Sequence, residues 1–177
     1  MSNDKSNPSA YNPSSDPSLD PEQFKQSFKH ALGRLASGVT VVSILEGENM
    51  RGMTASAFIS VSLEPLLVLV SVAKTAGMHQ SLQTASHYGI SILAEGQREI
   101  GDHFAWKSLE EAPPYHTKAG VALLEGALAH LACRIVDRHD AGDHTLMVGQ
   151  VEYVENFDHA PLLYYKGKYG QFLDLKE

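Results

Sequence analysis

The sequence has little cysteine, few basic residues and no long apolar run. Its single cysteine, Cys133, excludes an internal disulfide framework and agrees with a reducing compartment, so we expect a cytoplasmic protein. Its 14 lysines and arginines stand against 21 acidic residues, and they form no basic stripe. Nucleic acids and anionic membranes need clustered positive charge, so neither is an expected partner. The sequence also predicts no membrane-spanning helix, which would need about 20 apolar residues in a row.

Several common site motifs are missing as well. There is no G-x-G-x-x-G fingerprint, so a dinucleotide would not be held on a Rossmann unit. Zinc motifs of the His-Glu-x-x-His or paired-cysteine type are absent. The polar segment 137–144 fails the calcium-loop pattern, because Ala141 takes a ligand position and the distal glutamate is missing. We therefore predict no metal site, a turn over 137–144, and a structural role for Cys133.

The chain divides into a tail and one domain. Residues 1–19 are rich in Ser, Asn, Asp and Pro, which predicts a disordered tail, with an arm around a partner subunit as the alternative. The remaining residues, 20–177, contain enough apolar sequence for one globular domain. That domain begins with a helix, because Asp20 and Pro21 form a start signal for the apolar stripe of Phe24, Phe28, Ala31, Leu32 and Leu35. This stripe must pack against another surface.

Short strands dominate the rest of the sequence. Two further helices are predicted, one around Met78 and Leu82 and one over 97–105, and a surface loop or lid over 106–119. The first predicted strand covers 39–45, and after a turn at 46–49 the small-residue stretch pairs back with it. The later predicted strands cover 66–72, 89–94, 127–136, 145–151, 151–154 and 162–165. Many short strands with few peripheral helices predict a mainly β fold, a closed or split antiparallel barrel.

The stretch 50–75 is the most informative part of the chain. Its first half is small and rich in hydroxyl groups, so it offers little apolar area to bury. Small side chains let a flat ligand approach the backbone, while hydroxyls with Lys74 suit a phosphate. This indicates a nucleotide-like cofactor. The plainer interpretations are solvent-facing strand hydroxyls, a solvated Lys74, and Gly52 as a bulge or turn glycine rather than a point of close approach to a ligand.

Together with two other motifs, this stretch resembles a known family. Segment 38–42, Gly-Val-Thr-Val-Val, precedes it, and Gly142-Asp143-His144 precedes a later strand. The combination, over roughly residues 24–169, resembles the flavin reductase family, whose fold is the FMN-binding split β-barrel. The resemblance implies an NAD(P)H:flavin oxidoreductase that uses FMN or FAD with NADH or NADPH. Such enzymes are often the small partner of a two-component monooxygenase and are typically homodimers.

The resemblance also implies site residues. Backbone groups near Met53, Thr54, Ala55 and Ser56 would hold the flavin ring, and Ser60, Ser71, Lys74 and Thr75 would surround its ribityl chain and phosphate. His144 would face the flavin and nicotinamide. Phe104 and Tyr169 are candidate aromatic walls, with a core phenylalanine and a surface tyrosine as the alternatives.

Three other functions stay open at this point. The first is an electron carrier or sensor of the same fold that retains its FMN. The second is a pyridoxamine-phosphate oxidase or haem-handling relative, which would need more clustered Arg and Lys than the Lys74 region shows. The third is a structural barrel whose small residues pack subunits together.

Overall fold

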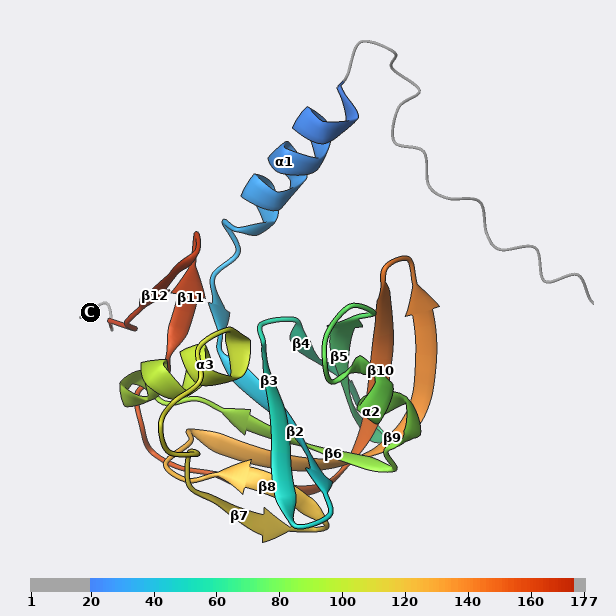
Figure 1. Cartoon of the computed structure of the whole chain (residues 1–177), viewed down its shortest axis with the longest axis vertical. Coiled ribbons are helices and arrows are strands. Elements are labelled where there is room, and N and C mark those ends of the chain that lie inside the picture. The colour runs from blue at the N-terminus through green and yellow to red at the C-terminus, as the bar shows by residue number, and fades with distance from the viewer. Residues whose placement is uncertain (1–19, 174–177) are drawn as a thin grey trace, which may run out of the picture.

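A computed structural model describes residues 20–173, and the predictions for the 1–19 tail lie outside this range. The fold is mainly β, as predicted, with antiparallel sheets and few helices (Figure 1). Its central sheet has seven strands in the order β3-β2-β6-β9-β10-β5-β4. These strands are β2 (Thr40–Glu46), β3 (Asn49–Ala55), β4 (Phe58–Leu63), β5 (Leu66–Ala73), β6 (His87–Ile92), β9 (Ala129–Ala141) and β10 (His144–Asn156).

Two small sheets and four helical segments complete the described structure. The small sheets are β1-β11-β12 and β7-β8. Their strands are β1 (Ser37–Gly38), β7 (Tyr115–Lys118), β8 (Val121–Leu124), β11 (Leu163–Tyr165) and β12 (Lys168–Gly170). The helices are α1 (Pro21–Leu32), α2 (His79–Thr84), the 3-10 helix η1 (Glu95–Gln97) and α3 (Arg98–Ala105). None of the helices between residues 20 and 173 is long and apolar enough to cross a membrane.

Helix α1 begins where the sequence predicts. Asp20 accepts a hydrogen bond from the Glu22 amide at 3.0 Å, which satisfies one of the free donors of the first turn. The helix then projects away from the sheets (Figure 1), and none of its residues is buried. Phe28 and Leu32 are each 57% exposed. The predicted packing of the apolar stripe is therefore not made within the described chain.

The long β9–β10 hairpin corrects two sequence predictions. The turn is confined to Gly142 and Asp143, because residues 137–141 continue β9 and His144 already begins β10. Gly142 has a φ of +64°, which glycine adopts without strain. The separate strand predicted at 151–154 is part of β10. The 137–141 end of β9 is mostly exposed, so its backbone ladder continues without the apolar alternation that marks a strand. Residues 151–154 lie at the other end of the hairpin, and they belong to β10 because the β9–β10 ladder continues across a register shift between Val151 and Tyr153.

The β7–β8 hairpin corrects a third prediction. Residues 115–118, expected as loop, form β7, and β8 was not predicted although all four of its residues are buried. The residues of β7 are mostly polar and give no strand pattern in the sequence. The segment is identified as a strand only by its backbone pairing with β8. The hairpin turns through Ala119 and Gly120, both at positive φ.

Two of the three apolar clusters in the described core contain most of its buried residues. The larger lies between the sheet and α2, and includes Tyr88, Ile90, Leu82 and Cys133. Burial raises the pKa of the Cys133 thiol to about 12, which keeps it protonated and inert, as its predicted structural role requires. The smaller cluster joins α3 to the start of β2 and to the β11 region, through Val39, Val41, Leu93, Leu124 and Leu162.

Candidate active site

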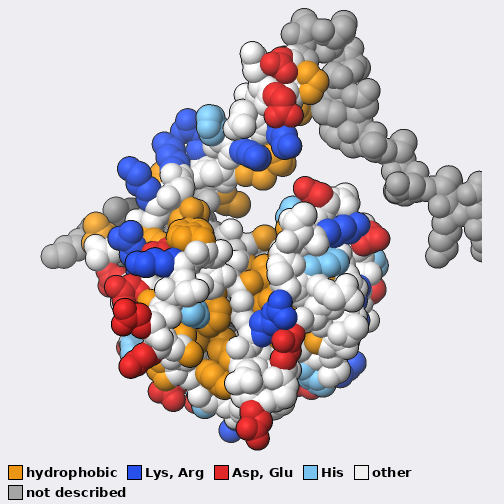
Figure 2. Space-filling model, in the orientation of Figure 1, with side chains coloured by type: hydrophobic (Ala, Val, Ile, Leu, Met, Phe, Trp, Pro, Cys, Tyr) orange, Lys and Arg blue, Asp and Glu red, His pale blue; other side chains and the backbone are white. Residues whose placement is uncertain are grey.

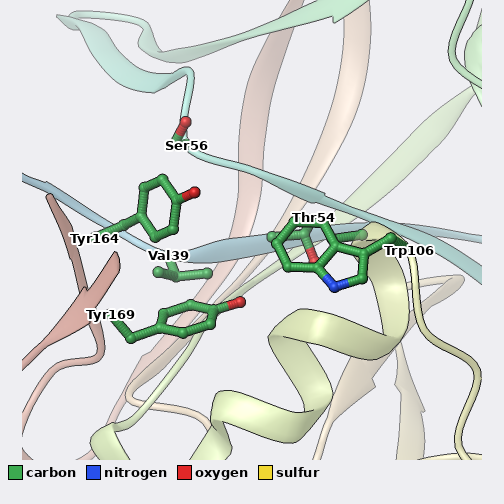
Figure 3. Close-up of a pocket in the computed structure, with 7 residues that line it drawn as sticks. Val39, Thr54, Ser56, Trp106, Tyr164 and Tyr169 are labelled. Carbon is green, nitrogen blue, oxygen red and sulfur yellow. The ribbon is translucent and has the colours of Figure 1, made fainter. Parts of the chain in front are cut away.

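A pocket opens beside α3, where three separate parts of the chain meet. Its volume is about 200 Å³. Figure 3 shows two tyrosines on one side of it and Trp106 on the other, with Val39 and Thr54 between them. The residues that line it are Val39, Thr54, Ser56, Ala105, Trp106, Tyr164 and Tyr169. Of these, Thr54, Ser56 and Tyr169 were predicted site residues.

Thr54 joins the pocket to α3. Its hydroxyl donates a 2.6 Å hydrogen bond to the Gly101 carbonyl, so β3 and α3 are held together at the pocket edge. Ser56, two residues on, is exposed in the break between β3 and β4. The hydroxyl of Thr54 is therefore already hydrogen-bonded within the protein, whereas Ser56 is exposed to solvent.

Tyr169 is held rigidly by groups on α3. Its hydroxyl donates to Asp102 at 2.9 Å, and the Arg98 guanidinium lies 5.5 Å from the centre of its ring. Partial burial, followed by the bond to the Asp102 carboxylate, raises the pKa of Tyr169 to about 12, so the phenol stays neutral at ordinary pH. Gly101 makes room for the ring, because a Cβ there would lie 2.9 Å from the Tyr169 hydroxyl oxygen.

Two further aromatic rings complete the walls. Tyr164 meets Tyr169 edge to face, with ring centres 5.5 Å apart and planes at 68°. Trp106, on the opposite wall, is 71% exposed. Sequence analysis missed four pocket residues: Val39, Ala105, Trp106 and Tyr164. The one available signal was the chain's sole tryptophan, placed directly after an amphipathic helix at the start of a polar loop.

A more polar cavity of about 420 Å³ adjoins the pocket and shares Trp106, Tyr164 and Tyr169 with it. Arg98, Asp102 and Lys168 line the rest, together with Gly167. Arg98 is also 3.9 Å from the Asp102 carboxylate. An aromatic slot therefore continues into a space with two cations, Arg98 and Lys168, that sequence analysis could not place.

The other predicted polar residues gather at the end of β5. His144 pairs with Ala73 across the β5–β10 ladder, and Ser71 lies two residues before Ala73. The Lys74 amide donates to the Asp143 carbonyl at 2.9 Å. The Lys74 ammonium also reaches the Asp140 carboxylate at 3.3 Å, and Thr75 follows it exposed. The fold therefore brings Ser71, Lys74, Thr75 and His144 to one place.

His144 and Asp143 form an exposed pair in the turn. Nδ1 of His144 lies 2.7 Å from Asp143 Oδ1. The hydrogen bond and the charge of His144 lower the pKa of the Asp143 carboxyl, which keeps it ionised near neutral pH. The side chains are 41% and 94% exposed, so solvent screens this interaction.

The backbone connects this polar group to the pocket. The Ser71 amide donates to the Ala57 carbonyl at 3.0 Å, and Ala57 directly follows Ser56. Figure 2 shows the molecule hollowed between the α3 side and the α2–β10 side, with hydrophobic side chains along the hollow. The small-residue stretch thus runs from the aromatic pocket to the group around Lys74 and His144.

The remaining predicted residues lie elsewhere. Met53 packs against the larger core cluster, and the buried Ala55 accepts a hydrogen bond from the Thr40 hydroxyl through its carbonyl. Ser60 is exposed on β4 and lines a separate apolar groove with Phe58 and Leu63.

Phe104 packs against the smaller core cluster, and Gly52 explains how it fits there. A Cβ at Gly52 would lie 2.8 Å from the Phe104 ring, and β3 pairs with β2 in regular register at this point. Gly52 is thus neither a bulge nor a turn residue. The group that approaches its backbone closely is the Phe104 side chain.

Comparison with known proteins gives a consistent result. The family model described as a flavin reductase like domain matches residues 32–173. An NADH-dependent flavin reductase of a Rhodococcus species is 49% identical over 145 residues, which are 80% of this chain and 82% of that protein. The reductase component of a Thermus thermophilus 4-hydroxyphenylacetate 3-monooxygenase is 45% identical over 145 residues, 80% of this chain and 91% of that protein.

A solved structure agrees with these sequence relatives. The flavin reductase PheA2 in its native state superposes with a TM-score of 0.82 at 35% identity, covering 88% of this chain and all of that one. The family model spans most of the sequence, and the elements it covers include both the aromatic pocket and the Gly-Asp-His turn. The chain therefore belongs to the flavin reductase family.

Proposed function

We propose that the protein is an NAD(P)H:flavin oxidoreductase that reduces FMN or FAD and releases it to a partner monooxygenase. The observation that carries this proposal is the continuous path from an aromatic pocket, past exposed Ser56, to the Lys74–His144 group. Family membership supports it, as do relatives named as flavin reductases and as a monooxygenase reductase component.

The residues along this path fit a flavin. A planar ring needs a flat slot with small residues at its edge, and Ser56 and Ala57 are small, exposed residues there. Lys74 supplies a cation for the phosphate. Its present partner is Asp140, whose side chain is 78% exposed, and a surface ion pair of this kind contributes little, so exchange for a phosphate is inexpensive. Ser71 and Thr75 add hydroxyls nearby.

The protein's contribution to the reaction is mainly positioning. When bound, the nicotinamide supplies a hydride and the flavin accepts it. Tyr164, Tyr169 and Trp106 would form the aromatic walls around a bound ring and restrict its orientation. Asp102 fixes the orientation of Tyr169. His144, with Asp143 beside it, orients the nicotinamide or balances the negative charge that reduction places on the flavin.

NADH is the proposed electron donor. The adjoining cavity offers Arg98 and Lys168 to the phosphates of a dinucleotide, but Arg98 already lies close to Asp102. With two cations and one carboxylate, the charge of this cavity does not select between NADH and NADPH. The Rhodococcus relative is named as NADH-dependent, which supports the choice of NADH.

The test is an assay of nicotinamide oxidation with added FMN or FAD, run before and after dialysis of the purified protein. Turnover that requires added flavin supports the reductase. A flavin that survives dialysis, with little turnover of added flavin, would instead support an electron carrier. A blocking variant, Ser56→Trp, should abolish turnover because it fills the slot from an exposed position, whereas Thr117→Trp on exposed β7 should not.

We also propose that the sheet closes as a split barrel. The two outer strands of the seven-stranded order, β3 and β4, are consecutive in the chain and joined only through Ser56 and Ala57. Bringing first and last strands together is what closure of a twisted sheet requires. The cytoplasmic location stays a prediction from the sequence.

Homodimer formation is a further proposal. The exposed stripe of α1 carries Phe24, Phe28 and Leu32, and the β4–β5 face has an apolar groove of about 310 Å³. Exposed apolar patches of this extent are typical of subunit interfaces. Light scattering on the Phe28→Lys variant should show loss of the dimer, and Gln26→Lys on the same helix is the matched control. A monomeric unmodified protein would contradict the proposal.

A further inference from the structure

Three residues far apart in the sequence meet on the side of the sheet where β7 packs. His116 comes from β7, His130 from β9 and Glu155 from β10, and their ligand atoms all lie within 4.8 Å of one another. His130 and Glu155 are direct partners in the β9–β10 ladder. The two imidazole rings have centres 5.2 Å apart. None of the three lines the aromatic pocket or the adjoining polar cavity.

His130 is the informative member of this cluster. It is 1% exposed, and its Nε2 lies 2.7 Å from the Leu124 carbonyl oxygen. A carbonyl can only accept, so Nε2 carries the proton and Nδ1 presents a lone pair. Nδ1 is buried and has no hydrogen-bond partner within the described chain. Buried polar atoms are normally paired, so this lone pair needs a partner.

We propose that His116, His130 and Glu155 bind a divalent transition-metal ion of the zinc class. Imidazole nitrogens and a carboxylate oxygen are ordinary ligands of such ions. With bonds of about 2.0 Å in a tetrahedron, ligand atoms lie about 3.4 Å apart, so side-chain shifts of about 1 Å would close the site.

The hydrogen bonds around His130 are of the kind that orient a metal-binding histidine. A metal-bound histidine usually donates its other N–H to a carbonyl or carboxylate, and the Leu124 carbonyl has this role here. The Leu124 amide donates in turn to the Ser91 hydroxyl at 2.9 Å, and Ser91 is the partner of His130 on β6. Both backbone polar groups of Leu124 are thus hydrogen-bonded, which fixes the ring that offers Nδ1.

The ion would have a structural role, as a cross-link between two hairpins. It would connect the β7–β8 hairpin to the β9–β10 hairpin through side chains, where no described strand pairing joins β7 to the seven-stranded sheet. Three protein ligands leave a tetrahedral ion one position for water. The competing explanation is that His130 only anchors Leu124, with His116 and Glu155 as unrelated neighbours.

The test uses full-length, untagged protein stripped with a chelator and then dialysed. Zn²⁺ is titrated by calorimetry, and Co²⁺ by its visible absorption, which reports the ligand geometry. Variants His116→Gln and Glu155→Gln each remove one ligand from a half-buried or exposed position. The control is His139→Gln, which removes an exposed histidine 2.8 Å from Asp137, outside the cluster.

We expect one Zn²⁺ per chain in the unmodified protein and in His139→Gln, with affinity at least about tenfold weaker in the two cluster variants. Zn²⁺ should also raise the melting temperature of the unmodified protein and of His139→Gln, but not that of the two cluster variants. Equal affinity in all four proteins, no bound ion, or loss of binding in His139→Gln would each overturn the proposal. Circular dichroism of each variant confirms that it is folded, so a loss of binding is not a loss of structure.

Discussion

Strand β10 has a histidine–carboxylate pair at each end, and the two pairs differ in almost every physical respect. At its start, His144 and Asp143 are neighbours in sequence and both exposed. Near its end, Glu155 faces His130 across the ladder, and His130 is almost completely buried. The exposed pair is accessible to a diffusing substrate but weakly coupled through solvent. The buried histidine instead contributes to the stability of the fold, through its hydrogen bond to the Leu124 carbonyl.

The strongest test of this difference between the two pairs is to replace each histidine separately. We expect His144→Ala to lower kcat/KM for NADH by about tenfold to a hundredfold, because a group that touches the substrate is lost. Its free energy of unfolding should change by less than about 0.5 kcal/mol, as is usual at exposed positions. Steady-state kinetics and urea denaturation measure the two quantities. An unchanged NADH dependence would remove His144 from the proposed site.

The opposite result is expected at the other end of the strand. His130→Ala should lower the free energy of unfolding by about 2 kcal/mol in chelator, since Leu124 loses a buried hydrogen-bond donor and a space is left. His130→Gln retains an N–H near the position of Nε2 and should lose less. Flavin reduction per folded molecule should be unchanged in both, and a kinetic defect equal to that of His144→Ala would contradict the division of roles.

A smaller effect is expected for Tyr169→Phe, which removes the hydroxyl bound to Asp102. The loss in stability should be about 1 kcal/mol near neutral pH, where the hydrogen bond is intact. Because the pKa of Tyr169 is raised to about 12, its contribution is full below about pH 10 and is lost as the pH rises from there to about 12. The stability difference between variant and parent should therefore shrink over that range in alkaline denaturation experiments.

The smallest effect is expected for Asp143→Asn. The substitution removes the carboxylate beside His144, and kcat/KM should fall only about twofold to fivefold, because solvent already screens the pair. The difference in kcat/KM between the variant and the parent enzyme should become smaller as salt is added to both assays, because salt screens the pair in the parent. If the variant equals His144→Ala in severity, the carboxylate has a direct role in binding or chemistry that its exposure does not suggest.

The same contrast explains what could be predicted from the sequence. The Asp20 cap and the turn at Gly47 depend on residues close together in the chain, and both lie where they were predicted. The Gly-Asp-His motif is also local and lies at a turn, although that turn is shorter than the predicted 137–144. The cluster of His116, His130 and Glu155 depends on strand register, which no local pattern contains. Trp106 and Tyr164 were missed for a related reason, since their pocket exists only once α3 and β11 are packed together.

Gly52 has a consequence for substrate choice. The Phe104 ring lies against its backbone, and Phe104 is on the helix that carries Gly101 and leads into Trp106. A Cβ at position 52 would lie 2.8 Å from the Phe104 ring, so either that ring or the helix that carries it must shift. A substitution at this position is thus a way to move α3, which leads into the pocket residue Trp106, without changing a pocket-lining side chain. Libraries designed to change which flavin or nicotinamide the enzyme prefers should include this position alongside the pocket walls.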